Sequence, residues 1–137
     1  MHKRGVARKN SIGVEPDGMF YNTHPANKYR MVRDISELEP RAFDLISMSH
    51  SLEHFNHPVQ YVTHLIKNYG KPGTLIMVEV PNREATDDAY LIHHPLAYSE
   101  RTLIGLMERC GCKTLETGNH GLGRMTNDYL IGIFEAL

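Results

Sequence analysis

Apolar and polar positions alternate along the chain in blocks that predict strands and helices in turn. The apolar runs at 43–48 and 75–80 are nearly continuous, which is typical of strands covered on both faces of a sheet. We therefore expect both to be interior strands. Four shorter apolar stretches also predict strands, at 11–14, 31–35, 113–117 and 129–134.

Two segments carry apolar side chains at helical spacing. Pro58 suits a first helical turn, and the apolar positions after it recur every three or four residues until Gly70. Ser99 is a good N-cap for a second amphipathic helix, which Gly111 ends. A third helix is expected from the mixed, polar pattern between 22 and 33.

The alternation of strands and helices predicts an α/β fold with a mostly parallel, doubly wound sheet and an antiparallel C-terminal strand. The chain has 137 residues, which suits one domain better than two. We therefore expect residues 1–137 to form a single domain.

Charge and composition exclude several kinds of partner. Fifteen Lys and Arg against sixteen Asp and Glu leave a formal charge of −1, which favours neither nucleic acid nor an anionic membrane as a partner. No apolar run approaches the roughly 18 residues of a membrane span. Since the basic start at 1–4 is also not followed by the apolar core of a signal peptide, a soluble, cytoplasmic protein is expected. A disulfide between Cys110 and Cys112 would close a strained, tiny loop, so reduced thiols are expected.

Short motifs follow one another in a distinctive order. They are Gly-Val-Glu-Pro-Asp at 13–17, Phe-Asp-Leu-Ile at 43–46, Leu-Glu-His at 52–54, a Lys-Pro-Gly turn into a strand at 71–82, and His-His-Pro at 93–95. This order resembles the class I S-adenosylmethionine-dependent methyltransferases, in particular a small-molecule group with the Leu-Glu-His signature. The resemblance implies a Rossmann-like sheet, S-adenosylmethionine as cofactor, and methyl transfer to a small-molecule nucleophile.

The glycine-rich loop of that family, G-x-G-x-G, follows a first strand that lies upstream of the strand predicted at 11–14. Residues 1–10 contain one glycine, Gly5. The resemblance therefore implies a partial domain whose first strand is missing, and we expect this chain alone to bind S-adenosylmethionine weakly or not at all.

A second function of a different class is a non-catalytic α/β module. Without the first strand, its two neighbours either pair directly or leave an edge that another chain can join. Self-association into a homo-oligomer is expected on this ground.

Candidate cofactor-binding residues follow from the resemblance and from position. The family places an acid at Glu15 to accept hydrogen bonds from both ribose hydroxyls, and it places Asp34 and Ile35 against the adenine. Ser49 and His50 lie at the carboxyl end of a predicted strand, where open α/β sheets bind their ligands. The alternatives are an exposed acid in a turn for Glu15 and a solvated charge for Asp34.

Histidines are the candidate catalytic residues. The resemblance places His54 in the lining of the cofactor or acceptor pocket, and a capping or structural histidine is the alternative. His93 and His94 lie in the polar connection 83–98, which is long for such a loop and favours a functional role. A histidine there, such as His94, can take a proton from a hydroxyl acceptor. An exposed loop histidine is the alternative.

The sequence His-Ser-Leu-Glu-His at 50–54 also fits H-x-x-E-H, a zinc pattern of one group of metallopeptidases. That pattern needs a continuous helix through both histidines, whereas His50 directly follows a predicted strand. No later block offers an evident third ligand. We therefore expect no metal site.

Overall fold

The computed structural model of the chain describes residues 10–23, 30–86, 90–121 and 127–137. It divides into two compact units, Met1–Pro40 and Arg41–Leu137.

The first unit holds a small parallel sheet. Strands β1 (Ile12–Val14) and β2 (Arg30–Val32) pair in parallel, with Gly13 opposite Met31. Both strands lie where the apolar stretches at 11–14 and 31–35 predicted them. The second is shorter than predicted, because the Asp34 side chain caps a 3-10 helix, η2 (Ile35–Glu37), and so ends the extended backbone.

Helices in the first unit differ from the prediction. The short helix α1 (Gly18–Thr23) begins directly after Asp17, whose side chain helps to start it by accepting a hydrogen bond from the Met19 amide at 2.7 Å. The prediction of a helix between 22 and 33 is wrong at 30–32, because these residues form β2. Residues 24–29 of that predicted helix lie outside the described residues.

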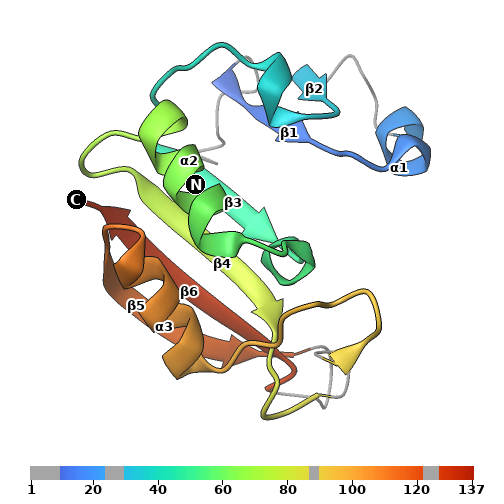
Figure 1. The fold of residues 1–137 in the computed structure, drawn as a ribbon, viewed down its shortest axis with the longest axis vertical. Helices are drawn as coiled ribbons and strands as arrows, with labels where there is room; N and C mark the ends of the chain where they lie inside the picture. The colour runs from blue at the N-terminus through green and yellow to red at the C-terminus, as the bar shows by residue number, and fades with distance from the viewer. Residues whose placement is uncertain (1–9, 24–29, 87–89, 122–126) are drawn as a thin grey trace, which may run out of the picture. The chain divides into compact units, whose positions relative to one another are not determined.

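The second unit is built on a four-stranded sheet (Figure 1). Its strands are β3 (Leu45–Ser49), β4 (Leu75–Pro81), β5 (Cys112–His120) and β6 (Tyr129–Ala136). The order across the sheet is β3-β4-β6-β5, with β3 and β4 parallel and β6 antiparallel to both β4 and β5. The predicted antiparallel C-terminal strand is thereby confirmed.

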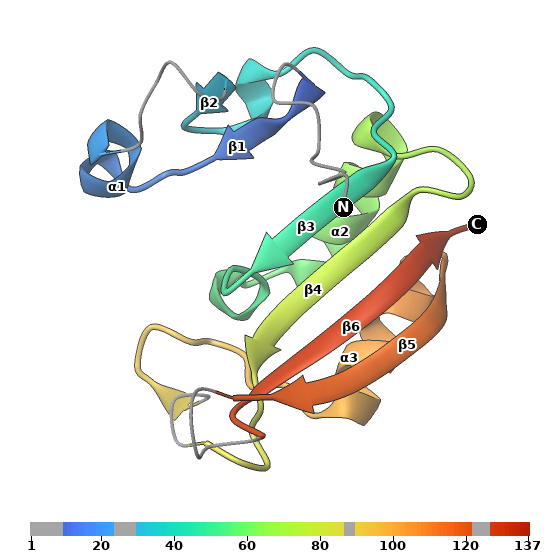
Figure 2. The ribbon, with the colours of Figure 1, turned by 180° about the vertical axis from the view of Figure 1, so that it is seen from behind.

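Helices α2 (Pro58–Tyr69) and α3 (Glu100–Arg109) lie on the same face of this sheet, as the two opposite views show (Figures 1 and 2). Both begin where the sequence predicted. Pro58 occupies the first turn of α2, and the Ser99 side chain accepts a hydrogen bond from the Thr102 amide to cap α3. None of the described helices is long and apolar enough to cross a membrane.

The core of this unit lies between the helices and the sheet. Alternate residues of β6 are buried on the helix side, and Phe134 among them is fully buried. Ile76, Val78 and Val80 of β4 lie on the same side, and the helices add Val62, Leu103 and Met107. Burial of this apolar face is the main term that stabilises the unit.

Strand β3 lies at an edge of the four-stranded sheet, so the prediction that it is interior is wrong. Strand β4, between β3 and β6, is interior as predicted. An apolar run shows that the faces of a strand are covered, but it carries no information about which hydrogen-bonding edges are paired. One face of β3 is also only partly covered, since the Leu45 side chain on it is 51% exposed to solvent.

Candidate functional site

Side chains from all four strands meet at the carboxyl edge of the parallel pair. The Glu79 carboxylate of β4 lies at the centre, and Ser49 of β3 donates a hydrogen bond to its Oε1 at 2.8 Å. His50 Nε2 lies 3.2 Å from Oε1, and His120 Nε2 lies 2.9 Å from Oε2. The Tyr129 ring stands edge-on to the His50 ring, with centroids 4.9 Å apart. We call these five residues the edge cluster.

Opposing effects act on the Glu79 carboxyl. Partial burial raises its pKa, but the hydrogen bonds from Ser49 and His120 and the charges of the two imidazoles outweigh burial and hold the pKa below its usual value. Glu79 is therefore an anion at neutral pH, and it orients both imidazoles.

The backbone at His50 is strained. Its φ of 47° lies in the left-handed region, which costs a residue with a Cβ about 1 kcal/mol. The His50 amide donates to the Glu79 carbonyl at 2.9 Å, so the chain turns sharply off β3 while remaining tied to β4. Strain of this kind is concentrated at functional positions.

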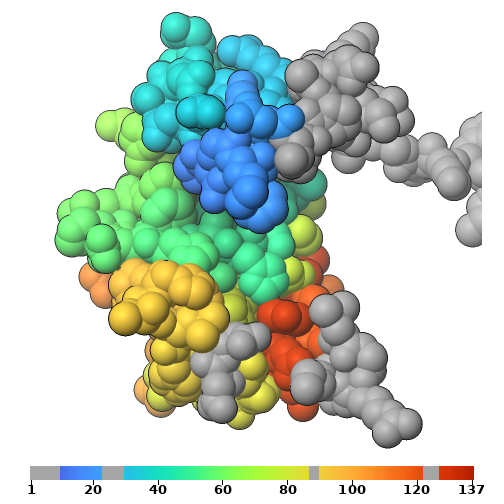
Figure 3. Space-filling model, turned by 90° about the vertical axis from the view of Figure 1, so that its right-hand side faces the viewer, coloured from blue at the N-terminus to red at the C-terminus, as the bar shows by residue number. Residues whose placement is uncertain are grey.

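Three histidines form a second group beside the edge cluster. The His54 ring stacks on His93 and meets His94 edge-on, with centroids 5.6 Å and 4.8 Å apart. In the space-filling view the amber surface of the loop at 90–98 lies directly against the green surface of the segment that follows β3 (Figure 3). The structure thus brings together the catalytic candidates His54 and His94, although they stand 40 positions apart in the sequence.

The helix that the H-x-x-E-H pattern requires is not formed. Leu52–His54 make one turn of 3-10 helix, η3, whereas His50 lies in the left-handed turn before it. The residues of the pattern therefore lack the continuous helix that the metallopeptidase group requires.

The predicted nucleoside-binding residues lie in the first unit. Glu15 follows β1, and its Oε1 accepts a hydrogen bond from the Asp17 amide at 2.9 Å. Asp34 is exposed and caps η2, where its Oδ1 accepts from the Ser36 amide at 2.8 Å. Hydrogen bonds from the Ser36 side chain and then from its amide lower the pKa of Asp34. Asp34 thus has the structural role of a helix cap, and its contact with adenine stays a prediction, as does that of its half-buried neighbour Ile35.

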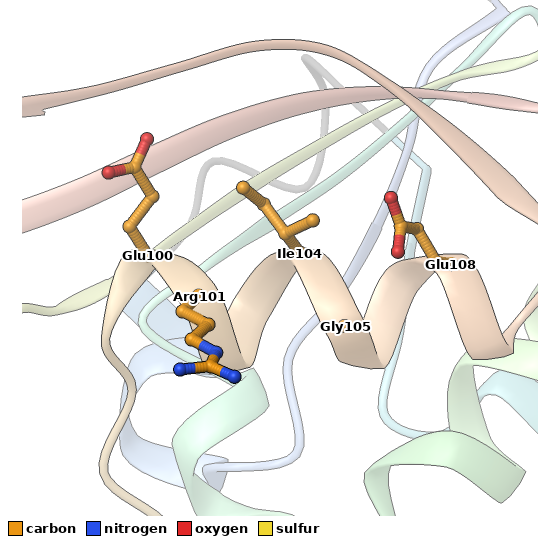
Figure 4. Close-up of a pocket in the computed structure, with 5 residues that line it drawn as sticks. All are labelled: Glu100, Arg101, Ile104, Gly105 and Glu108. Atoms are coloured by element: carbon orange, nitrogen blue, oxygen red, sulfur yellow. The ribbon is translucent and has the colours of Figure 1, made fainter.

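A shallow hollow lies on the outer side of α3 (Figure 4). Glu100, Ile104 and Glu108 point to one side of the helix, and Arg101 points away from them. Thr117 of β5 donates a hydrogen bond to Glu100 at its rim. None of the predicted site residues lines this hollow, so it does not belong to the candidate site.

Glu79 and His120 contribute most to the charge of the edge cluster, but neither was predicted from the sequence as a site residue. Glu79 stands in an apolar run that was interpreted only as a strand, and its charge within that run was the available signal. His120 gave no local signal, because only the pairing of β5 with β6, which sets His120 opposite Tyr129, brings it to this edge.

The second unit is an α/β structure with polar side chains gathered at the carboxyl edge of its parallel strands, the edge at which open α/β sheets generally bind ligands. Residues 2–117 match a family described as a methyltransferase domain. Because the match spans most of the chain, the chain belongs to this methyltransferase family. No protein of curated function matches the sequence significantly.

Solved structures share the fold. A SAM-dependent methyltransferase from Archaeoglobus fulgidus is similar with a TM-score of 0.74 at 15% identity, over 91% of this chain and 75% of that one. A chain in the complex between the Haloferax volcanii Trm112 methyltransferase activator and a methyltransferase is similar with a TM-score of 0.76 at 12% identity, over 98% and 73%. An S-adenosylmethionine-dependent methyltransferase from Clostridium acetobutylicum gives 0.69 at 14% identity, over 93% and 75%. The fold is therefore Rossmann-like, as the sequence predicted.

Proposed function

We propose that this chain binds S-adenosylmethionine and takes part in methyl transfer to a small-molecule nucleophile. The observation that carries the proposal is the edge cluster, in which a partly buried carboxylate orients two imidazoles at the ligand-binding edge of a methyltransferase fold. When bound, the cofactor supplies an electrophilic methyl group.

The described polar groups fit the cofactor in their chemistry. Glu15 is half-buried at the end of β1, and the two oxygens of a carboxylate suit the vicinal hydroxyls of a ribose. Asp34 and Ile35 offer an acceptor and an apolar contact for adenine, and Ser49 and His50 offer polar groups at the end of β3. Each of these roles is part of the proposal.

His120 is the best placed proton acceptor of the edge cluster. A carboxylate oxygen only accepts, so the neutral imidazole bonded to Glu79 through Nε2 carries its proton on Nε2 and a lone pair on Nδ1. A carboxylate also orients the histidine base of hydrolytic triads, although there it is bonded to Nδ1 and the base is Nε2. In the proposed reaction, His120 takes the proton that an acceptor hydroxyl or amine releases, and the proton then passes to water. His54 and His94 remain candidates for contact with the acceptor.

The test is titration of the isotope-labelled chain with S-adenosylmethionine, followed residue by residue by NMR. This method detects weak binding, which is the most that the sequence predicts for this chain alone. Amide shifts should be confined to the neighbourhoods of Glu15, Asp34 and Ser49, and Glu15→Gln should weaken binding about 5- to 150-fold, the range for a lost charged hydrogen bond. Glu39→Gln, at an exposed glutamate outside the proposed site, is the control and should bind as the unaltered chain does.

Two results would contradict the proposal. One is the absence of shifts at millimolar cofactor, and the other is a set of shifts that leaves the Glu15 neighbourhood and the end of β3 unchanged.

A second candidate function is that of an association module. The specific observation in its favour is that β3 pairs on one side only within the described sheet, which leaves backbone donors and acceptors for a further strand.

A further inference from the structure

Glu53 is a buried carboxylate that the proposed reaction does not use. The residue is 1% exposed, and neither of its carboxylate oxygens has a hydrogen-bond partner among the described residues. His50 Nδ1 lies 3.6 Å from Oε1, beyond the usual length of a hydrogen bond. Buried carboxylates are normally hydrogen-bonded, paired with a cation or bound to a metal ion. Glu53 thus lacks the partner that its burial requires.

The buried hydroxyl of Tyr98 does not supply that partner. It donates to the Leu52 carbonyl at 3.5 Å instead. Burial, and after it the negative charge of Glu53, raises the pKa of Tyr98, so this hydroxyl stays protonated and neutral. Tyr98 therefore leaves both carboxylate oxygens of Glu53 without a donor.

Two imidazoles lie beside this carboxylate. One ligand atom each from Glu53, His54 and His94 lies within 4.8 Å of the other two. Glu53 and His54 are neighbours in η3, and His94 comes from the loop after β4. The His93 carbonyl accepts a hydrogen bond from His54 Nδ1 at 3.0 Å, which leaves the lone pair of the neutral ring on Nε2. Such a bond to the far nitrogen is the usual support of a metal-binding histidine.

We propose that Glu53, His54 and His94 bind a divalent transition-metal ion, with Zn²⁺ as the best match. Two imidazoles and one carboxylate are a ligand set that suits Zn²⁺ and its first-row neighbours, and not Mg²⁺ or Ca²⁺, which take oxygen ligands. The ion neutralises Glu53 and leaves at least one coordination position for water or another ligand. The inference concerns the metal alone and does not depend on the proposed methyl transfer.

The required movement is small. Ligand atoms of a tetrahedral zinc site lie roughly 3.4 Å apart, so atoms that now lie within 4.8 Å of one another must approach by at most about 1.4 Å. His54 is exposed and His94 is half-buried, so neither ring is enclosed by the core. The buried Glu53 stays in place as the fixed ligand.

Other groups of the second unit are weaker candidates. The Glu79 carboxylate already accepts from Ser49 and His120 and pairs with His50, so it needs no ion. Cys110 and Cys112 are buried, and burial raises the pKa of Cys112 to about 11, which keeps its thiol protonated. A competing explanation for Glu53 is compensation by a protonated His50 without any metal.

The test is titration of the metal-free full chain with Co²⁺, read by visible absorption, and competition with Zn²⁺. One equivalent should bind with nitrogen and oxygen coordination and without a thiolate charge-transfer band. His54→Gln and His94→Gln should each weaken binding at least tenfold. His64→Gln, on the outer side of α2, is the matched control and should leave binding unchanged, as should His120→Gln of the edge cluster.

Thermal melting provides the second measurement. Zn²⁺ should raise the melting temperature of the unaltered chain, because a ligand of the folded state stabilises it, and should not raise that of His94→Gln. Glu53→Gln should melt no lower than the metal-free chain, since it removes an unpaired buried charge, and should lose the response to Zn²⁺. If Glu53→Gln does not fold, the response of His54→Gln and His94→Gln to the metal ion decides whether these residues bind it.

Three outcomes would overturn the proposal. The first is the absence of one-equivalent binding, and the second is binding that survives both His54→Gln and His94→Gln. The third is binding that His120→Gln abolishes, which would place the ion in the edge cluster. Suppose instead that the chain binds no metal while His50→Gln destabilises it strongly, as expected when one partner of a buried ion pair is removed. In that case His50, and not a metal ion, is the partner of Glu53.

Discussion

Glu79 is the residue whose ionisation should be visible in the stability of the whole unit. Its pKa in the folded chain lies below the usual value of 4.5, so around that pH the unfolded chain binds more protons than the folded one. The stabilisation is therefore complete above about pH 4.5 and is lost as the pH falls through the folded-state pKa.

Glu79→Gln should accordingly show a smaller loss of stability on acidification than the unaltered chain. The measurement is urea unfolding between pH 7 and pH 3, with Glu108→Gln on the exposed side of α3 as the control. Parallel stability curves for the unaltered chain and Glu79→Gln would show that the hydrogen bonds from Ser49 and His120 do not hold this pKa down.

His50 offers a test of backbone strain at a single residue. Glycine reaches a φ of 47° without the Cβ clash, whereas alanine does not. Since His50→Gly and His50→Ala both lose the imidazole, their difference isolates the backbone. His50→Gly should be the more stable by about 1 kcal/mol in urea unfolding. Equal stabilities would mean that the left-handed turn relaxes when the ring is removed.

Strand β6 and helix α3 contain two glycines with opposite expected responses to alanine. A methyl group at position 132 would lie 2.5 Å from the fully buried Phe134 ring, which has little room to move. At position 105, inside α3, it would meet nothing within 4 Å.

Gly132→Ala should therefore destabilise the chain by about 1 to 3 kcal/mol through overpacking. Gly105→Ala should stabilise it by about 0.5 to 1 kcal/mol, because alanine is the better helix former. Thermal or urea unfolding of the two variants checks whether the free energy of unfolding falls in Gly132→Ala and rises in Gly105→Ala. A neutral Gly132→Ala would show that the contact of β6 with α3 adjusts easily.

The four-stranded sheet of the second unit has two edge strands, β3 and β5. They differ in how well they are protected against pairing with a strand of another chain. Strand β5 carries an irregular register between Thr114 and Glu116 and has charged side chains along it, and both features discourage pairing. Strand β3, with the sequence Leu-Ile-Ser-Met-Ser, has neither. Association between copies of the chain should therefore use β3.

Light scattering after size exclusion should detect a dimer or larger assembly at high concentration. Leu45→Lys, at the exposed start of β3, should return the chain to a monomer, since lysine protects sheet edges. Leu115→Lys on β5 is the matched control, because Leu115 is 45% exposed and lies on the other edge. A monomer at every concentration would contradict self-association.

The sequence by itself determined the elements whose cause is local. Helix α2 begins at a proline and ends at a glycine, α3 begins at a serine cap, and both have an apolar stripe, so their positions followed from spacing. The strands from 43 onward were located by their apolar runs. Ser49 and His50 were placed correctly at the sheet edge, because a residue that follows a parallel strand must lie there.

Only the tertiary structure decided which of these residues meet. His94 lies beside Glu53 and His54, and His120 beside Glu79, because chain segments 30 or more positions apart pack together, and no local pattern records that packing. The edge position of β3 was likewise beyond the sequence, since hydropathy reports buried faces and not paired edges. Local preferences set the elements, but strand order and loop packing assembled the site.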